Sequence, residues 1–161
     1  MKINERFYPI LATIAVLVLL YGYGIIEHRA FSDTYVLGAL LTDNAFLIIT
    51  AVGMTFVILS GGIDLSVGSM IAFIGVLMAE LVAGFGMHPV TAALISLVVG
   101  AGFGAFMGVI IAKFDIQPFI ITLAGMFFLR GMCFLINLDS VPIDHPFVSA
   151  FSGFKVPLPG R

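Results

Sequence analysis

Residues 60–69, with the sequence Ser-Gly-Gly-Ile-Asp-Leu-Ser-Val-Gly-Ser, form a short polar segment in a chain that is otherwise almost continuously apolar. Apolar runs precede it at 44–59 and follow it at 67–87. In hydrocarbon, each unpaired backbone amide or carbonyl costs several kcal/mol. A break of this kind must therefore lie at a membrane interface, be enclosed by protein, or line a path that holds water.

Two interpretations of this segment are open, and they do not exclude each other. In the structural interpretation, Gly61 and Gly62 let the chain reverse direction, and Asp64 or Ser66 caps the free amides of the next helix. In the functional interpretation, Asp64, Ser66 and Ser69 face a solute path, because ionisable groups near membrane depth usually serve function.

Two further polar residues accompany the apolar runs. Arg130 lies inside 118–136, where an arginine costs about 2.5–3.5 kcal/mol to insert and each Leu, Ile or Phe returns about 0.3–0.6 kcal/mol. Ten such apolar residues stand in that run, so its insertion should survive the charge. Arg130 then either pairs or snorkels for structural reasons, or it joins the solute path. We place Asn44, at the start of its apolar run, with the path residues as well.

The composition identifies an integral membrane protein. Hydrophobic residues make up 61% of the chain and charged residues 10%, against roughly half and a quarter in soluble domains. The net charge of −2 offers no basic patch for nucleic acid. We find no phosphate-binding loop, catalytic motif or metal-ligand cluster, so we predict no catalytic residues, metal or cofactor. The single cysteine, Cys133, is read as a small buried hydrophobe.

Hydropathy predicts an all-α fold, a polytopic transmembrane helix bundle of about five spans in one transmembrane domain, residues 1–161. Each run is long enough, at about 1.5 Å per residue, to cross all or most of a hydrocarbon core of about 30 Å. The first run is too long for the apolar region of a cleaved signal peptide, which has about 7–15 residues. The predicted spans are 7–26, 44–60, 65–87, 90–112 and 118–136, with a short surface helix within 31–43 and an extramembrane loop at 137–161.

The loop at 137–161 carries four prolines, which argue against a further helix there. Within the fourth span, Gly100, Gly104 and Gly108 recur at intervals of four and share one helix face. Such a groove without side chains predicts close helix packing.

The distribution of basic residues predicts the orientation. Lys2, Arg6 and Lys113 fall on one side of the membrane, and the loops on the other side carry most of the acidic residues. The positive-inside rule then places the amino terminus in the cytoplasm.

Several stretches resemble the inner-membrane permeases of bacterial ABC sugar importers, the group of the ribose, arabinose, xylose and galactofuranose systems. The matching stretches are 41–46 and 51–69, which include the Gly-Gly-Ile-Asp-Leu-Ser-Val-Gly-Ser string, and 118–131 with 142–146 beyond it. Together they look most like the galactofuranose-type permease.

The resemblance implies a multi-pass subunit of the bacterial inner membrane, surrounded by membrane lipid. It implies pairing with a second permease subunit, as a homodimer or heterodimer, a periplasmic sugar-binding protein that delivers the sugar, and a cytoplasmic ABC ATPase that drives alternating access. Permeases of this group are about twice as long, so we expect this chain to be an amino-terminal piece without the loop that docks on the ATPase.

Two other functions remain open at this point. One is an ion-coupled secondary carrier or channel, in which Gly61-Gly62 is the break of a discontinuous helix and Asp64 binds the coupling ion. The other is a structural membrane fragment that assembles with other subunits and transports nothing itself.

Overall fold

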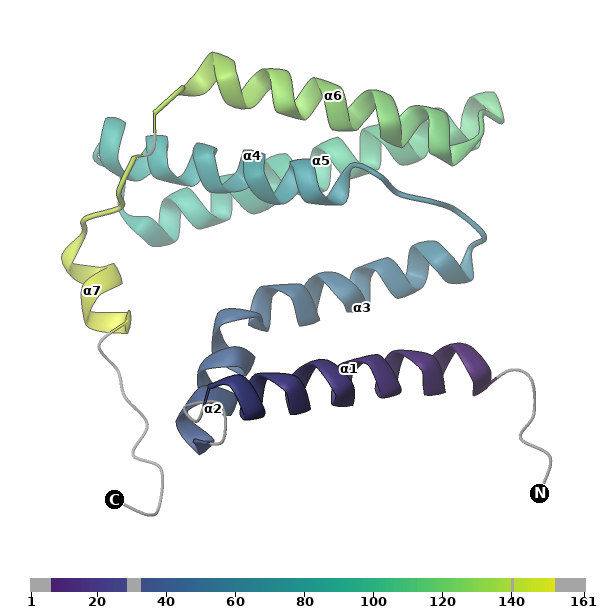
Figure 1. Cartoon of the computed structure of the whole chain (residues 1–161). Helices are drawn as coiled ribbons and strands as arrows, with labels where there is room; N and C mark the ends of the chain where they lie inside the picture. The colour runs from purple at the N-terminus through teal and green to yellow at the C-terminus, as the bar shows by residue number, and fades with distance from the viewer. Residues whose placement is uncertain (1–6, 29–32, 140, 153–161) are drawn as a thin grey trace. The chain divides into compact units, whose positions relative to one another are not determined.

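The computed structural model describes residues 7–28, 33–139 and 141–152, and it divides the chain into two compact units, Met1–Val52 and Gly53–Arg161. Within the described residues the regular elements are all helices, which confirms the predicted all-α class (Figure 1). The boundary between the units falls inside a helix, and the prediction of a single transmembrane domain stays a prediction.

The amino-terminal unit holds α1 (Tyr8–Glu27), α2 (Thr34–Asp43) and the first part of α3 (Ala45–Leu59). Helix α1 has 20 residues, is apolar enough to cross a membrane and matches the first predicted span. Helix α2 lies where the short surface helix was predicted. Helix α3 has 15 residues and rises about 22 Å, which is shorter than a hydrocarbon core of about 30 Å.

The second unit holds α4 (Val67–Ala79), the π-helical turn η3 (Glu80–Gly84), α5 (Pro89–Phe114), α6 (Pro118–Ile136) and α7 (Pro146–Ser152). Helix α4 and η3 are continuous and together span 18 residues. With α1, α5 and α6 they make four helices, among the described residues, that are long and apolar enough to cross a membrane. Helices thus occupy three of the predicted spans in this unit, and their crossing of a membrane stays a prediction.

Helices α4, α5 and α6 lie side by side, with α5 antiparallel to the other two (Figure 1). Small and hydroxyl side chains, with a few larger apolar ones, occupy their contact faces, whereas large apolar side chains such as Leu97, 71% exposed, point outward. This arrangement suits a bilayer, where lipid already solvates apolar surface and close packing drives association. The buried residues are Ser66 just before α4, Ser69, Phe73 and Ala79 of α4, Val82 of η3, Pro89, Ala92, Ser96 and Met107 of α5, and Thr122, Gly125 and Leu129 of α6.

The sequence analysis predicted no further helix within 137–161. This prediction is wrong at residues Pro146–Ser152, which form α7. Pro146 opens this helix, where a missing amide hydrogen costs nothing because the first amides of a helix have no intrahelical partner. The prolines were read as helix breakers, but proline breaks a helix only in its interior. With seven residues α7 is too short to span a membrane. Residues 153–161 of the predicted loop lie outside the described residues.

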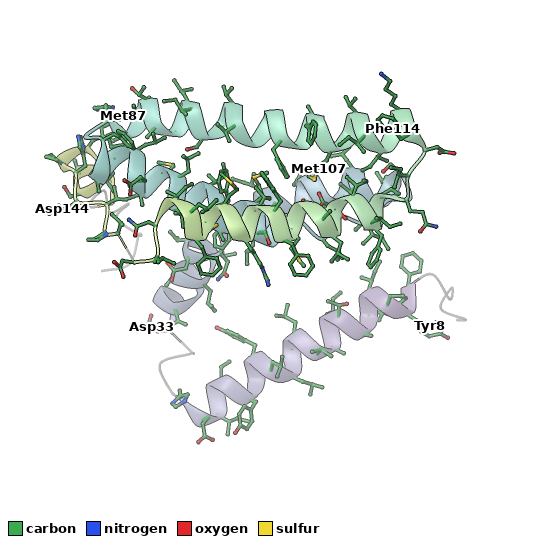
Figure 2. All side chains as sticks on the ribbon, turned by 90° about the horizontal axis from the view of Figure 1, so that it is seen from above. Tyr8, Asp33, Met87, Met107, Phe114 and Asp144 are labelled. Atoms are coloured by element: carbon green, nitrogen blue, oxygen red, sulfur yellow. The ribbon has the colours of Figure 1, made fainter. Side chains whose placement is uncertain are left out.

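Gly125 lies at a close contact between α5 and α6. A Cβ atom added at Gly125 would lie 2.6 Å from Sδ of Met107 and 3.5 Å from the ring of Phe103, and the side chain of Met107 is drawn in Figure 2. Gly131 of the same helix has no heavy atom within 4 Å of such a Cβ. The two glycines therefore form a matched pair for testing helix contact.

We predict that Gly125→Ala destabilises the bundle by about 1–3 kcal/mol, because the added methyl overpacks the contact with Met107. Gly131→Ala should instead be neutral or stabilising, since alanine is the better helix former in open space. Thermal unfolding of both variants in detergent, followed by circular dichroism, measures the difference. Equal melting temperatures for the two variants would contradict the α5–α6 contact.

Candidate functional site

Helix α3 ends in a left-handed glycine cap. Gly61 has φ +76°, and its N–H donates to the carbonyl of Ile58 at 3.0 Å while the N–H of Gly62 donates to the carbonyl of Val57 at 3.0 Å. This pair of bonds is the Schellman motif, which satisfies carbonyls that the helix end leaves unpaired. The Oγ of Ser60 also donates to the carbonyl of Val57, at 2.8 Å. The predicted turn at Gly61-Gly62 is confirmed.

Asp64 closes the other side of the break. Its Oδ1 accepts the backbone N–H of Ser66 at 2.8 Å and the hydroxyl of Ser66 at 2.6 Å. Ser66 precedes the first residue of α4, yet its side chain makes no capping bond to the helix. Asp64 therefore forms an Asx turn with Ser66, the residue just before α4, and its negative charge lies near the amino-terminal end of α4, where the helix dipole favours an anion.

Thr122 joins the break to α6. Its Oγ1 lies 3.1 Å from the carbonyl oxygen of Ile63 and 3.3 Å from that of Phe119. The first contact crosses 59 residues of sequence and gives a hydrogen-bond donor to a carbonyl of the non-helical segment. The sequence interpretation missed Thr122. Its position in the second turn of a helix that begins with Pro118 was the available signal, because that helix starts at the end of the bundle where the break lies.

A cavity of about 230 Å³ opens beside the break. Its polar groups come from Ser60, Asp64 and Thr122, and within the described residues Oδ2 of Asp64 takes part in no hydrogen bond. Hydroxyls and a carboxylate in an otherwise apolar cavity can hydrogen-bond a polar solute and fix its orientation. The full lining is Val57, Ser60, Gly62, Ile63, Asp64, Gly104, Met107, Gly108, Ile111, Pro118 and Thr122.

The three glycines of α5 have different surroundings. A Cβ at Gly100 would lie 3.6 Å from Ile74 of α4, so this glycine faces a neighbouring helix. Gly104 and Gly108 have no heavy atom within 4 Å of such a Cβ, and both line the cavity. Their missing side chains thus widen the space beside the break. The prediction that all three serve close helix packing stays a prediction.

Of the five residues predicted to line a solute path, Asp64 lines this cavity. Ser66, just before α4, and Ser69, in α4, are buried, 2% and 4% exposed, and Oγ of Ser69 has no hydrogen-bond partner among the described residues. Asn44, in the other unit, donates from Nδ2 to the carbonyl of Leu40 at 2.8 Å. Arg130 is exposed on α6, outside the cavity lining. The solute-path assignment of these residues stays a prediction.

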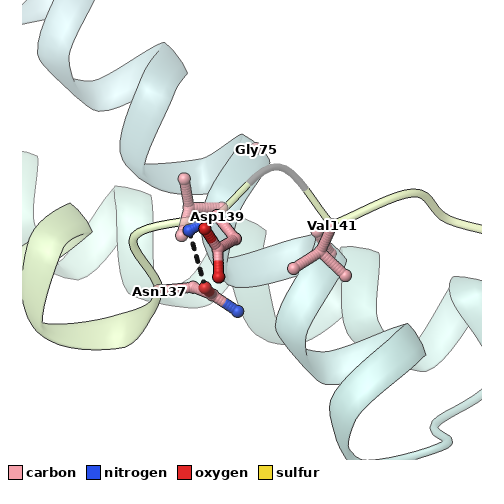
Figure 3. Close-up of a pocket in the computed structure, with 6 residues that line it drawn as sticks. Gly75, Asn137, Asp139 and Val141 are labelled. Atoms are coloured by element: carbon pink, nitrogen blue, oxygen red, sulfur yellow. Dashed lines mark hydrogen bonds between the residues drawn. The ribbon is translucent and has the colours of Figure 1, made fainter.

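A second cavity, of about 210 Å³, lies toward the other end of α4. Asn137 organises it: its Oδ1 accepts the N–H of Asp139 at 2.9 Å (Figure 3), and its Nδ2 donates to Oε2 of Glu80 at 3.2 Å. Gly84 leaves room for that carboxylate, since a Cβ there would overlap it. The lining residues are Gly75, Val76 and Ala79 of α4 and Asn137, Asp139 and Val141 after α6.

Comparison with known proteins decides the family. The family model described as the permease component of branched-chain amino acid transport systems matches residues 36–154, well over half of the chain. The chain belongs to this permease family. The inner membrane ABC transporter permease protein YjfF of Escherichia coli (strain K12) is 53% identical to this chain. The matched region covers 97% of this chain and 47% of YjfF.

Two further relatives carry substrate names. The fructose import permease protein FruG of Bifidobacterium longum is 38% identical over 92% of this permease chain and 44% of the relative. The ribose import permease protein RbsC of Escherichia coli (strain K12) is 42% identical over 67% of this chain and 33% of the relative. The permease chain thus spans at most about half the length of these curated relatives. No solved structure matches it significantly.

We predict that Gly61→Ala destabilises the permease chain by about 1–2 kcal/mol, because only glycine adopts the left-handed conformation of this cap without strain. The matched control is Gly68→Ala, in the first turn of α4, where a Cβ meets open space and alanine should be neutral or favourable. Thermal unfolding in detergent compares the two variants. A Gly61→Ala protein as stable as the Gly68→Ala protein would show that the cap does not form.

Proposed function

We propose that this chain forms part of the membrane-spanning permease subunit of an ATP-binding-cassette importer in the bacterial inner membrane. The observation that carries the proposal is 53% identity, over nearly the whole chain, to a protein named as an inner membrane ABC transporter permease. The apolar helices and the polar cavity beside the break between α3 and α4 support it, because non-helical backbone at membrane depth is tolerated where it lines a cavity.

The substrate we propose is a monosaccharide. The family description names branched-chain amino acids, whereas relatives at 38% and 42% identity are named fructose and ribose import permeases. The cavity beside the break favours a polyol, since it offers the hydroxyls of Ser60 and Thr122 and the carboxylate of Asp64. Galactofuranose is the specific sugar that the resemblance of 118–131 and 142–146 favours.

The mechanism we propose is alternating access driven by a separate ATPase subunit. In it, the permease pairs with a second permease subunit and receives its sugar from a periplasmic binding protein, and ATP binding and hydrolysis outside this chain rock the helices. Thr122 would then couple α6 to the break, because its hydrogen bond to the carbonyl of Ile63 joins the two directly. Movement of α6 would change the lining of the cavity.

The orientation we propose has the amino terminus in the cytoplasm, following Lys2, Arg6 and Lys113. The break and its cavity then lie toward the cytoplasmic face, and the cavity at Asn137 lies toward the periplasmic face. A solute moving inward would reach the Asp64 cavity late in its passage.

An ion-coupled carrier is the second candidate, because discontinuous helices of this kind bind coupling ions in such transporters. In an importer Asp64 would serve the structure of the break, because its Oδ1 accepts from the amide and hydroxyl of Ser66, whereas in a carrier its Oδ2 would bind the ion. Asn caps helices about as well as Asp, so an importer should keep most of its uptake when the charge is removed. A carrier that binds its ion at Asp64 should lose uptake completely.

Uptake of radiolabelled monosaccharides and leucine, in cells with and without the complete permease system, tests the proposal. We expect system-dependent uptake of a monosaccharide that stops when arsenate depletes ATP and persists when an ionophore collapses ion gradients. The Asp64→Asn variant should keep ATP-dependent uptake. Leucine uptake instead of sugar uptake would overturn the substrate class, and loss with the ionophore or with Asp64→Asn would favour the carrier. Absence of any uptake would leave a structural membrane fragment.

A further inference from the structure

Two histidine-proline steps, 57 residues apart in the sequence, meet in the second unit. His88 caps α5 by accepting the N–H of Val90 on its Nδ1 at 3.3 Å, and His145 caps α7 by accepting the N–H of Phe147 on its Nδ1 at 3.1 Å. The ring of His88 lies edge-on to that of His145, with centroids 5.4 Å apart, and 5.1 Å from the ring of Phe147. Figure 2 shows the preceding residues, Met87 and Asp144, at the same end of the helices.

The capping bonds determine the protonation state of both rings. A neutral imidazole carries one proton, so a ring whose Nδ1 accepts a hydrogen bond holds its proton on Nε2. Neither nitrogen of His88 or His145 then has a lone pair available for a metal ion. Within the described residues no group of three or more potential metal ligands occurs either. The pair is therefore suited to a proton-sensitive contact rather than a metal site.

The described residues of the loop between α6 and α7, 137–139 and 141–145, contact the rest of the unit at both ends of the loop. At its start, Nδ2 of Asn137 donates to Oε2 of Glu80 in η3. At its end, His145 packs against His88. Between these contacts, Asn137, Asp139 and Val141 line the cavity of about 210 Å³ together with Gly75, Val76 and Ala79 of α4 (Figure 3).

We propose that His88 and His145 form a pH-sensitive clamp that holds the α6–α7 loop over α4 and releases it on acidification. Protonation converts each Nδ1 from an acceptor into a donor that faces a backbone N–H, so both capping bonds are lost. It also places two positive charges a few ångströms apart. One of them lies at the amino terminus of α5, where the helix dipole disfavours a cation.

Other charged groups near the clamp act in the opposite direction. Glu80 of η3, and Asp139 and Asp144 of the loop, are carboxylates that favour protonated rings. Asp139 and Asp144 are exposed, so solvent and salt screen them, and Glu80 is engaged by Asn137. Lys113, at the far end of α5, is about 37 Å away by helix rise and has no effect at that distance. Each capping bond needs an unprotonated Nδ1, so protonation of that atom and the capping bond exclude each other.

Hydrogen exchange at the amides of Val90 and Phe147, resolved by fragmentation mass spectrometry on the full chain in detergent, tests this clamp. Histidine changes charge between about pH 5 and pH 8, so exchange is compared near those limits after correction for the intrinsic rate. We expect protection of both amides to fall about tenfold at the acidic limit, which corresponds to the loss of a capping bond. Protection in α6 should stay constant.

The matched control is the double variant His88→Asn and His145→Asn, because asparagine accepts the capping bond without titrating. Its two amides should be protected equally at both pH values. If the double variant does not fold, as judged by α6 protection, the single variant His145→Asn carries the test and should lose the response at Phe147. A Glu80→Gln variant should keep the wild-type response. Protection that is independent of pH in the wild type, or a response that persists in the asparagine variants or disappears in Glu80→Gln, would overturn the proposal.

Discussion

The break between α3 and α4 is governed by one constraint, which is that backbone polar groups near hydrocarbon must find partners inside the protein. Several carbonyls and amides of the break have such partners. The carbonyls of Val57 and Ile58 accept the amides of Gly62 and Gly61, the carbonyl of Ile63 accepts the hydroxyl of Thr122, and the amide of Ser66 donates to Asp64. These bonds lower the cost of a non-helical segment between two apolar helices, because they pair backbone groups at both ends of the break and at Ile63.

The residue types of the break follow from these bonds. The left-handed cap of α3 requires glycine at position 61. The amide of Ser66 needs a short side-chain acceptor two residues earlier, which Asp or Asn provides at position 64. Small and hydroxyl residues also explain the packing of α4, α5 and α6, because they let the helix backbones approach closely. The cavity forms beside the break because Gly104 and Gly108 carry no side chain to fill it. Asp64 and Thr122, which bond backbone groups of the break, thus also line the polar cavity.

Local patterns were sufficient to predict the helices. Hydropathy located α1, α4, α5 and α6, and the glycine pair with Asp64 indicated the turn and its cap. These features depend on interactions within a few residues, which the sequence order displays directly. The short helix α7 was missed because Pro146 was taken as a breaker, although its place at the first helical position makes it a helix start.

Contacts between distant segments could not be predicted from the same patterns. The bond from Thr122 to Ile63 and the pairing of His88 with His145 each join residues more than fifty positions apart. Each depends on how helices pack, and hydropathy carries no information on which face of one helix meets which face of another. The cavity beside Asp64 results from that packing. The sequence therefore indicated the carboxylate of Asp64 but not the residues of α5 and α6 that line the cavity with it.

Thiol labelling at the break tests the central claim most directly, because an enclosed polar cavity and a lipid-exposed loop differ in access to water. In a Cys133→Ala background, a small charged methanethiosulfonate reagent is applied to Ser60→Cys, which lies in the cavity lining, and to Ile58→Cys, which is exposed on the apolar surface of α3. The account predicts rapid labelling at position 60 and none at position 58. No labelling at position 60, together with quenching of a fluorophore there by spin-labelled acyl chains, would contradict it.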